Sequence, residues 1–234
     1  VFTKDSTNKI ILKKLYMNEV KLYSILIPEC YSNKQIKSYL IRYFSKLENF
    51  NNYEEGDLFP STYYISKDTK ISNLLNIMHT KARDKYGQLY EEYKNNISTI
   101  LTNKNEVLIL ASMVEAESKL KEEKAKIAAV FLNRLKIGMK LQSDPTVIYG
   151  INKTVYIDKP LSKNDLLIRH EWNTYRIFGL PPTPICNVGI DSFYAVLNPD
   201  KNNDLYFVAD GKGGHIFSKT YKEHLKNIKK VYKK

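Results

Sequence analysis

The strongest constraint on the fold of this 234-residue chain is a central stretch that must form two consecutive helices. Residues 105–118, NEVLILASMVEAES, are almost continuously apolar, which predicts a helix buried inside the protein. A second helix is predicted in EEKAKIAAVFLNRLKIG, whose apolar stripe consists of Ile127, Val130, Phe131 and Leu135. Gly138 stands where a glycine commonly ends a helix. We therefore expect a hydrophobic core built around this helical pair.

Shorter elements flank this pair on both sides. Residues 20–28 read as a strand, and Ser32 can cap a helix with the stripe Ile36, Leu40 and Phe44. The other predicted elements are a strand at 62–65, an amphipathic helix over 69–86, a helix entered at Asp144 and Pro145, a short helix at 190–198, a hairpin over 204–218 and a basic helix over 220–234. Helices and hairpins mix without a regular βαβ alternation, so the predicted fold class is α+β.

The balance of charge favours an anionic partner. The net charge is +12, from 37 basic and 25 acidic residues, and such an excess suits nucleic acid, an acidic membrane face or an acidic polymer. Basicity alone does not choose among these partners, and a merely solvated Lys-rich surface explains it equally well. No apolar run has the roughly 18 residues that a membrane span requires. Because the chain opens with VFTKDST and no initiator Met, we expect that a signal or anchor segment has been removed.

The cysteines and histidines predict neither a metal site nor a cofactor. Cys30 and Cys186 are the two cysteines, and their wide separation matches no metal or redox spacing, so we expect free thiols in preference to a disulfide. The histidines at positions 79, 170, 215 and 224 show no H-x-x-x-H pattern. The stretch DGKGG at 210–214 lacks the spacing of a phosphate-binding loop and reads as the turn of the hairpin. His215 would then open the second strand, as a rim or core residue or as part of a site.

Two carboxylates stand near the end of the first central helix. Glu117 continues the stripe of Leu110, Met113 and Val114, whereas Glu115 points about 200° away. A carboxyl group set against apolar surface has its pKa raised, and a Glu that is protonated near neutral pH can act as a general acid. The alternative is that Glu117 lies in a frayed last turn or pairs with a lysine.

A loop rich in aromatic, amide and proline residues follows further along the chain. WNTY at 172–175 precedes GLPPTP at 179–184. Aromatic rings beside amides suit sugars, because rings stack on the apolar faces and amides bond the hydroxyl groups. A Trp and a Tyr that merely pack around a structural loop explain the same residues.

Taken together, five segments resemble the endolytic murein transglycosylases of the YceG/MltG type. They are EEGDLFPSTY, LASMVEAES, AAVFLNRLKIGMKLQSDPTVIYG, WNTYRIFGLPPTPI and LYFVADGKGGHIFS, which keep the family's order and approximate spacing. The resemblance implies a lytic transglycosylase that cuts peptidoglycan glycan strands, with the second Glu of E-x-E-[TS], here Glu117, as the catalytic residue. Three positions depart from the family's usual residues: Trp172 for Tyr, Thr183 for Gly and Ser143 for Thr.

The resemblance also implies a site and a setting. Gln142, Ser143, Asn173 and Tyr175 are candidates for holding the sugar, Tyr63 and His215 are weaker candidates for the groove wall, and Glu115 is expected to bond a nearby loop. Residues 1–52 resemble a LysM-like subdomain and 53–234 the catalytic domain. The family implies one N-terminal membrane helix, absent from this chain, with the catalytic domain facing the periplasm or cell exterior. Peptidoglycan strands and cell-wall synthases are the expected partners, and no cofactor is expected.

Three rival functions stay open on the sequence. A glycan-binding module without catalysis would tolerate the loss of Glu117. A nucleic-acid binder would explain the charge, although no recognised RNA- or DNA-binding motif is visible. A muramidase would cleave the same bond with water and leave reducing MurNAc ends.

Overall fold

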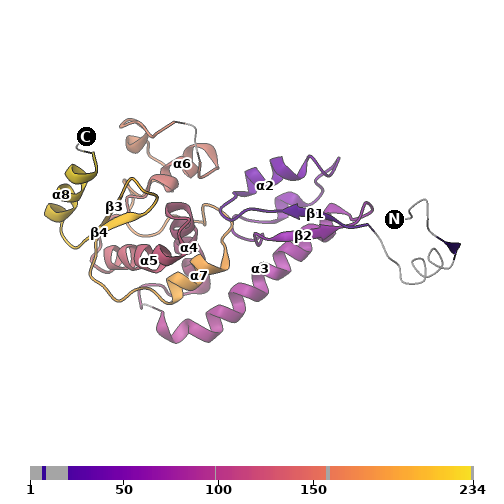
Figure 1. The fold of residues 1–234 in the computed structure, drawn as a ribbon, viewed down its shortest axis with the longest axis horizontal. Coiled ribbons are helices and arrows are strands. Elements are labelled where there is room, and N and C mark those ends of the chain that lie inside the picture. The colour runs from indigo at the N-terminus through magenta and orange to yellow at the C-terminus, as the bar shows by residue number, and fades with distance from the viewer. Residues whose placement is uncertain (1–6, 9–20, 98, 157–158, 233–234) are drawn as a thin grey trace.

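The fold comes from a computed structural model that describes residues 7–8, 21–97, 99–156 and 159–232. It is of the α+β class, as the sequence predicted. An N-terminal unit with one small sheet lies at one end of the molecule, and a mainly helical unit carrying a β-hairpin lies at the other (Figure 1). Val20, with which the expected first strand begins, lies outside the described residues.

The N-terminal unit is a two-stranded antiparallel sheet with a helix packed beside it. Strand β1 (Tyr23–Leu26) pairs with β2 (Thr62–Ile65), and α2 (Asn33–Leu40) and the short helix η1 (Phe50–Asn52) lie between them in sequence. Ser32 caps α2 in a capping box with Gln35, which confirms the predicted start of this helix. The buried stripe of α2 closes a compact apolar core against the sheet.

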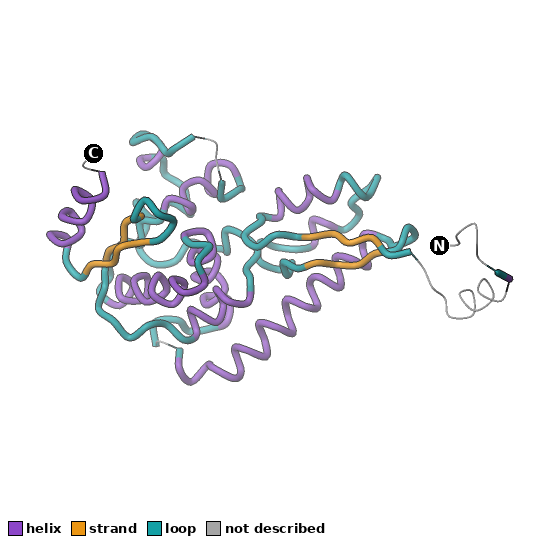
Figure 2. Tube along the Cα trace, viewed as in Figure 1, coloured by secondary structure: helices purple, strands orange, loops and turns teal. Residues whose placement is uncertain are grey.

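Helix α3 (Ile71–Tyr93) connects the two units. Its first half buries Leu74 and Met78 in the N-terminal core, and its second half buries Ala82 and Tyr86 in the main core. The helix ends at Tyr93, seven residues beyond the predicted end. It runs diagonally across the molecule (Figure 2). Because β2 and the first half of α3 complete the N-terminal core, the change from one core to the other falls within α3. The domain boundary after residue 52 stays a prediction.

The main core is built around the predicted helical pair. Helices α4 (Lys104–Glu117) and α5 (Lys121–Lys136) are joined by a short turn, and α7 (Ile190–Leu197) packs against both. Ile127, Phe131 and Leu135 of the predicted stripe pack in this core, and Val130 is also fully buried. Gly138 has φ +66, the left-handed conformation that favours glycine just after a helix end.

The remaining elements surround this core. They are the short helices η2 (Lys94–Asn96) and η3 (Asp165–Leu167), helix α6 (Asp144–Asn152), strands β3 (Tyr206–Ala209) and β4 (His215–Ser218), and helix α8 (Tyr221–Tyr232). The two strands form the predicted antiparallel hairpin, with Ala209 opposite His215. Helix α8 packs on this hairpin and has no buried residue. No helix within the described ranges has the length and apolar character needed to cross a membrane.

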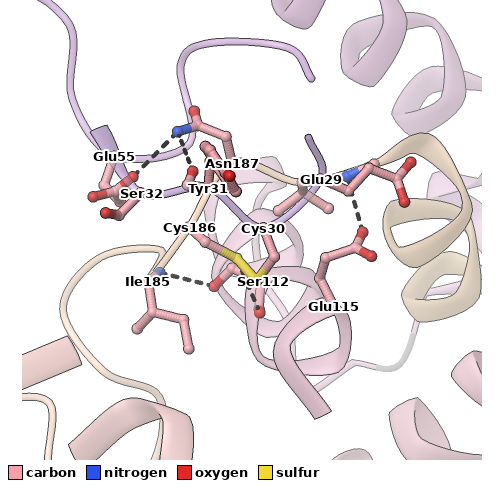
Figure 3. The surroundings of a disulfide bond; sticks show 12 residues. Glu29, Cys30, Tyr31, Ser32, Glu55, Ser112, Glu115, Ile185, Cys186 and Asn187 are labelled. Atoms are coloured by element: carbon pink, nitrogen blue, oxygen red, sulfur yellow. Dashed lines mark hydrogen bonds between the residues drawn. A yellow bond between two sulfur atoms is a disulfide. The ribbon is translucent and has the colours of Figure 1, made fainter. Parts of the chain in front are cut away.

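The expectation of free thiols was wrong, because Cys30 and Cys186 form a disulfide (Figure 3). Their Cα atoms lie 4.8 Å apart although 156 positions separate them in sequence. Backbone pairing explains the proximity: Cys30 N donates to Asn187 O and Asn187 N donates to Tyr31 O, at 2.9 and 3.0 Å. The disulfide therefore joins the N-terminal unit to the loop that precedes α7.

Candidate active site

Glu117 is the last residue of α4, and its side chain lines a cavity of about 310 Å³. The side chain of Asn103 caps the start of this helix by accepting from Glu106 N. At the other end, Ser118 is already extended (φ −142), so the chain turns away directly after Glu117. The carboxyl group therefore stands at a helix C-terminus, where unpaired carbonyl groups disfavour negative charge.

The surroundings of Glu117 hold its pKa near neutrality. Burial is the largest effect and raises the pKa, a hydrogen bond from Ser143 lowers it, and the nearby Asp144 carboxylate raises it, with a net pKa of about 7. That bond runs from Ser143 Oγ to Glu117 Oε1 over 2.5 Å. The charges of His215 and Arg134 also favour the ionised form. A carboxyl group with such a pKa can both release and accept a proton near neutral pH.

The cavity combines ionisable groups with an aromatic wall. Polar side chains reach it from the end of α4, from α5 and from the segments around residues 142–144 and 175, while β3 and α8 supply aromatic rings. The lining residues are Glu117, Arg134, Gln142, Asp144, Tyr175, Tyr206, Phe207, Tyr221 and His224.

The segment before α6 is held against the WNTY turn by three contacts. Gln142 has a left-handed backbone (φ 49), and its N–H donates to Thr174 O. Ser143 N donates to Thr174 Oγ1 over 2.9 Å, and Tyr175 Oη donates to Asp144 Oδ1 over 2.6 Å. These contacts bring Gln142, Ser143 and Tyr175 to Glu117, as the sequence analysis expected of substrate-binding residues.

Two other expected site residues lie elsewhere. Asn173 is fully buried, and its amide donates to the carbonyls of Leu166 and Ile168 while its Oδ1 accepts from Tyr175 N. It shapes the turn and does not line the cavity. Tyr63 packs in the N-terminal core, where its hydroxyl donates to Phe59 O.

His215 lies behind the cavity and does not line it. Its Nδ1 lies 2.8 Å from Glu123 Oε2, and its backbone N–H donates to Glu123 Oε1 over 2.8 Å. Ser118 Oγ donates to the same carboxylate over 3.4 Å. This arrangement ties the second hairpin strand to the start of α5, close to the end of α4.

Several residues that line the cavity were not predicted from the sequence. Arg134 interrupts the apolar face of α5, the same signal that singled out Glu117. Its Nε donates to Leu205 O over 2.7 Å and its Nη1 to Leu141 O over 2.5 Å, so backbone carbonyls hold the guanidinium in place. Tyr221 and His224 are three residues apart on α8 and therefore share a helix face. Their spacing in the sequence could have indicated this aromatic face, whereas the excess of lysines predicts only a basic helix.

Glu115 has the structural role that the sequence predicted. Its Oε1 lies 2.7 Å from Lys124 Nζ, and its Oε2 accepts from Gly189 N over 2.9 Å. Although Glu115 points about 200° away from Glu117, it is also buried, because α5 and α7 both pack against α4. Within the described part of the chain, no three His, Cys, Asp or Glu side chains gather as metal ligands would.

Trp172 and Thr183, two of the positions that the resemblance marks as departures, contact each other. Trp172 Nε1 donates to Thr183 Oγ1 over 3.0 Å, and Thr183 Oγ1 donates to Pro184 O. The ammonium of Lys153 stands 3.3 Å from the centroid of the Trp172 ring. The indole therefore ties the WNTY turn to the proline-rich loop.

The sequence of this chain is similar to those of known proteins. The chain is 43% identical over 175 residues to the endolytic murein transglycosylase of Bacillus subtilis strain 168, covering 74% of this chain and 46% of that protein. It is 33% identical over 180 residues to the endolytic murein transglycosylase of Streptococcus pneumoniae serotype 2, covering 74% of this chain and 31% of that protein. The matched region thus spans less than half the length of both relatives.

A solved structure and a family model cover most of the chain. The crystal structure of a YceG-like protein from Listeria monocytogenes superposes with a TM-score of 0.69 at 28% identity, over 93% of this chain and 80% of that one. The model of the YceG-like family matches residues 1–230. The chain therefore belongs to the YceG-like family.

Proposed function

We propose that this chain is a lytic transglycosylase that cleaves the bond between MurNAc and GlcNAc within peptidoglycan glycan strands. The single observation that carries the proposal is the Glu117 carboxyl group, which lines a cavity and has a pKa of about 7. A general acid must be protonated at the working pH, and such a pKa keeps a large fraction of Glu117 protonated. The curated relatives are named endolytic murein transglycosylases, which agrees with this substrate.

The reaction begins with proton transfer from Glu117. The carboxyl group protonates the glycosidic oxygen as the bond to MurNAc C1 breaks, and the GlcNAc portion leaves with its hydroxyl restored. Positive charge develops on C1 and the ring oxygen of MurNAc. The carboxylate of Asp144, which lines the same cavity and accepts from Tyr175 Oη, is suited to stabilise that charge.

The second step uses the same carboxylate as a base. Glu117, now ionised, takes the proton from the C6 hydroxyl of MurNAc, and the C6 oxygen attacks C1. The product is a 1,6-anhydro-MurNAc end, Glu117 regains its proton, and no water is consumed. Because the nucleophile belongs to the substrate, the reaction gains from proximity. Gln142 and Tyr175 line the cavity and supply polar groups for the sugar hydroxyls.

A muramidase is the second candidate, and Asp144 is the observation that favours it. Hydrolytic glycosidases commonly place two carboxylates across the bond, and Asp144 shares the cavity with Glu117. In that reaction Asp144 would act on the far side of C1, and water would enter the product. The two products differ by one water molecule, which hydrolysis adds to the MurNAc end and the transglycosylase reaction does not.

Digestion of purified peptidoglycan in H₂¹⁸O, followed by mass spectrometry of the glycan fragments, tests the proposal. A transglycosylase gives anhydro ends without ¹⁸O, each 18 Da lighter than a hydrolytic end in ordinary water. Reducing MurNAc ends that carry ¹⁸O would establish the muramidase instead. Binding without any cleavage by the full chain would reduce the protein to a glycan-binding module.

The cellular setting is part of the same proposal. The substrate lies outside the cytoplasmic membrane, and the Cys30–Cys186 disulfide suits that oxidising side. The family resemblance adds an N-terminal membrane anchor, a role in ending growing strands and cell-wall synthases as partners. The N-terminal unit, with one helix and one 3-10 turn between two antiparallel strands, would help to hold the glycan as a LysM-like subdomain. Protease accessibility of the full-length protein in spheroplasts tests the location.

A further inference from the structure

The C-terminal helix contributes side chains to the cavity that Glu117 lines. Tyr221 and His224 reach it from the first turn of α8, and Tyr206 reaches it from β3. The three rings form one cluster. His224 stacks on Tyr206 with centroids 5.2 Å apart and planes 25° apart, and Tyr221 lies 5.8 Å from Tyr206 and 6.3 Å from His224.

Local hydrogen bonds hold this turn of α8 in place. Thr220 and Glu223 form a reciprocal cap, because Glu223 N donates to Thr220 Oγ1 and Thr220 N donates to Glu223 Oε2. One turn later, Asn227 Nδ2 donates to Ser218 Oγ at the end of β4. The first turn is therefore fixed against the hairpin even though α8 buries no residue.

The His224 ring of this cluster is uncharged at neutral pH. Burial and the charge of Arg134 both lower the pKa of His224, which keeps its imidazole neutral at pH 7. His224 and the Arg134 guanidinium, 5.6 Å from the ring centroid, both lie against Tyr206. Tyr221 is the exposed member of the cluster, with 59% of its surface accessible.

We propose that Tyr221 is a sugar-stacking platform of the active site, supported from behind by Tyr206 and His224. The pyranose next to the cleaved bond would lie with its apolar C–H face on the Tyr221 ring while its polar edge faces Gln142 and Asp144. Flat aromatic surface suits one face of a sugar, and polar side chains suit its hydroxyl groups. Helix α8 is then a specificity element of the catalytic site. This inference rests on the proposed function, since it assigns a sugar to the same cavity.

The test compares three variants on one helix. Tyr221→Ala removes the ring, Tyr221→Phe keeps it without the hydroxyl, and Tyr232→Ala removes a ring that is 68% exposed on α8 but does not line the cavity. Initial rates on soluble, uncross-linked glycan strands give kcat and KM for each. We expect Tyr221→Ala to raise KM about tenfold with a smaller change in kcat, and the other two to stay near the parent protein.

A binding measurement separates failure of this inference from failure of the proposed function. Calorimetric titration of the same glycan strands into Glu117→Gln, with and without Tyr221→Ala, needs no turnover. Weaker binding of the double variant supports the platform. An unchanged KM and an unchanged Kd on loss of the ring, or an equal loss in Tyr221→Phe, would overturn it. If the parent protein forms no product but binding still depends on the ring, the platform stands and the transglycosylase does not.

Discussion

Ser143 Oγ donates a 2.5 Å hydrogen bond to Glu117 Oε1, which joins the start of α6 to the end of α4. The bond stabilises the carboxylate, whereas burial and Asp144 destabilise it. The resulting pKa of about 7 is a balance between opposing effects. Ser143 thus lowers the pKa of Glu117, and a single substitution can remove either an effect that lowers this pKa or one that raises it.

Ser143→Ala should shift the pH profile of the reaction toward higher pH. Loss of the hydroxyl removes a bond that favours the ionised form, so the pKa of Glu117 rises above about 7. Because the acid acts when protonated, kcat/KM falls as pH rises through this pKa, and in the variant the fall begins later. The measurement is kcat/KM between pH 5 and 9. Ser143→Thr keeps the hydroxyl and should stay close to the parent profile. If kcat/KM fell at the same pH in the parent protein, Ser143→Ala and Ser143→Thr, the Ser143 bond would not affect the pKa of the catalytic acid.

Glu115→Gln should destabilise the protein without removing catalysis. Lys124 would stay buried with only the more distant carboxylate of Glu29, at 3.9 Å, and breaking a buried pair costs about 3–5 kcal/mol. Urea denaturation measures the loss, and activity per folded molecule should be kept. Lys121→Ala is the matched control, because its ion pair with Asp191 is exposed and screened by solvent, so its loss should leave the urea midpoint nearly unchanged. Equal effects of the two substitutions would argue against the buried pair.

The disulfide should contribute measurably to stability. It closes a loop between positions 156 residues apart, and removing a native disulfide typically costs about 2–5 kcal/mol. We expect Cys30→Ala/Cys186→Ala and the reduced parent protein to unfold at similarly lowered urea concentrations. The oxidised protein, refolded with a glutathione couple and denatured without reductant, should show no thiol reactive to maleimide. Two titratable thiols under those conditions would rule the bond out.

The Trp172–Thr183 contact should appear as a coupling in a double-mutant cycle. Trp172→Phe removes the indole N–H, and Thr183→Val removes the hydroxyl with little change of shape. The free energy of unfolding should show a coupling of about 0.5–1.5 kcal/mol, the usual contribution of one hydrogen bond. Additive single effects would mean that the two residues act independently.

Local patterns were enough to predict most of the elements. The apolar stripe of α5, the Ser32 cap and the glycine-rich hairpin turn each depend on neighbours within a few residues, and the structure confirms all three. The position of Glu117 at a cavity followed from one carboxylate extending an apolar face. Its role as the catalytic acid stays a prediction.

The remaining features depend on contacts between distant segments. The Cys30–Cys186 pairing needs the backbone of residues 30–31 to meet Asn187, which no spacing reveals. The side-chain amide of Asn173 suggests a sugar contact, but it donates its hydrogen bonds to the neighbouring backbone carbonyls. Tyr221 has no such signal in the sequence, because it becomes part of the cavity only when α8 packs on the hairpin.

The most direct test of the central claim is the pKa of Glu117, measured by ¹³C NMR of the side-chain carboxyl carbons in selectively labelled protein. Comparison of the parent protein with Glu117→Gln identifies the resonance that belongs to this residue. Burial also raises the pKa of Glu55 to about 7, so we predict two carboxyl titrations near pH 7. Only the one that belongs to Glu117 should be missing in the variant, together with loss of cleavage in that variant. A titration near 4.5, the ordinary value for a glutamate, would contradict the account, because Glu117 would then have no proton to give at neutral pH.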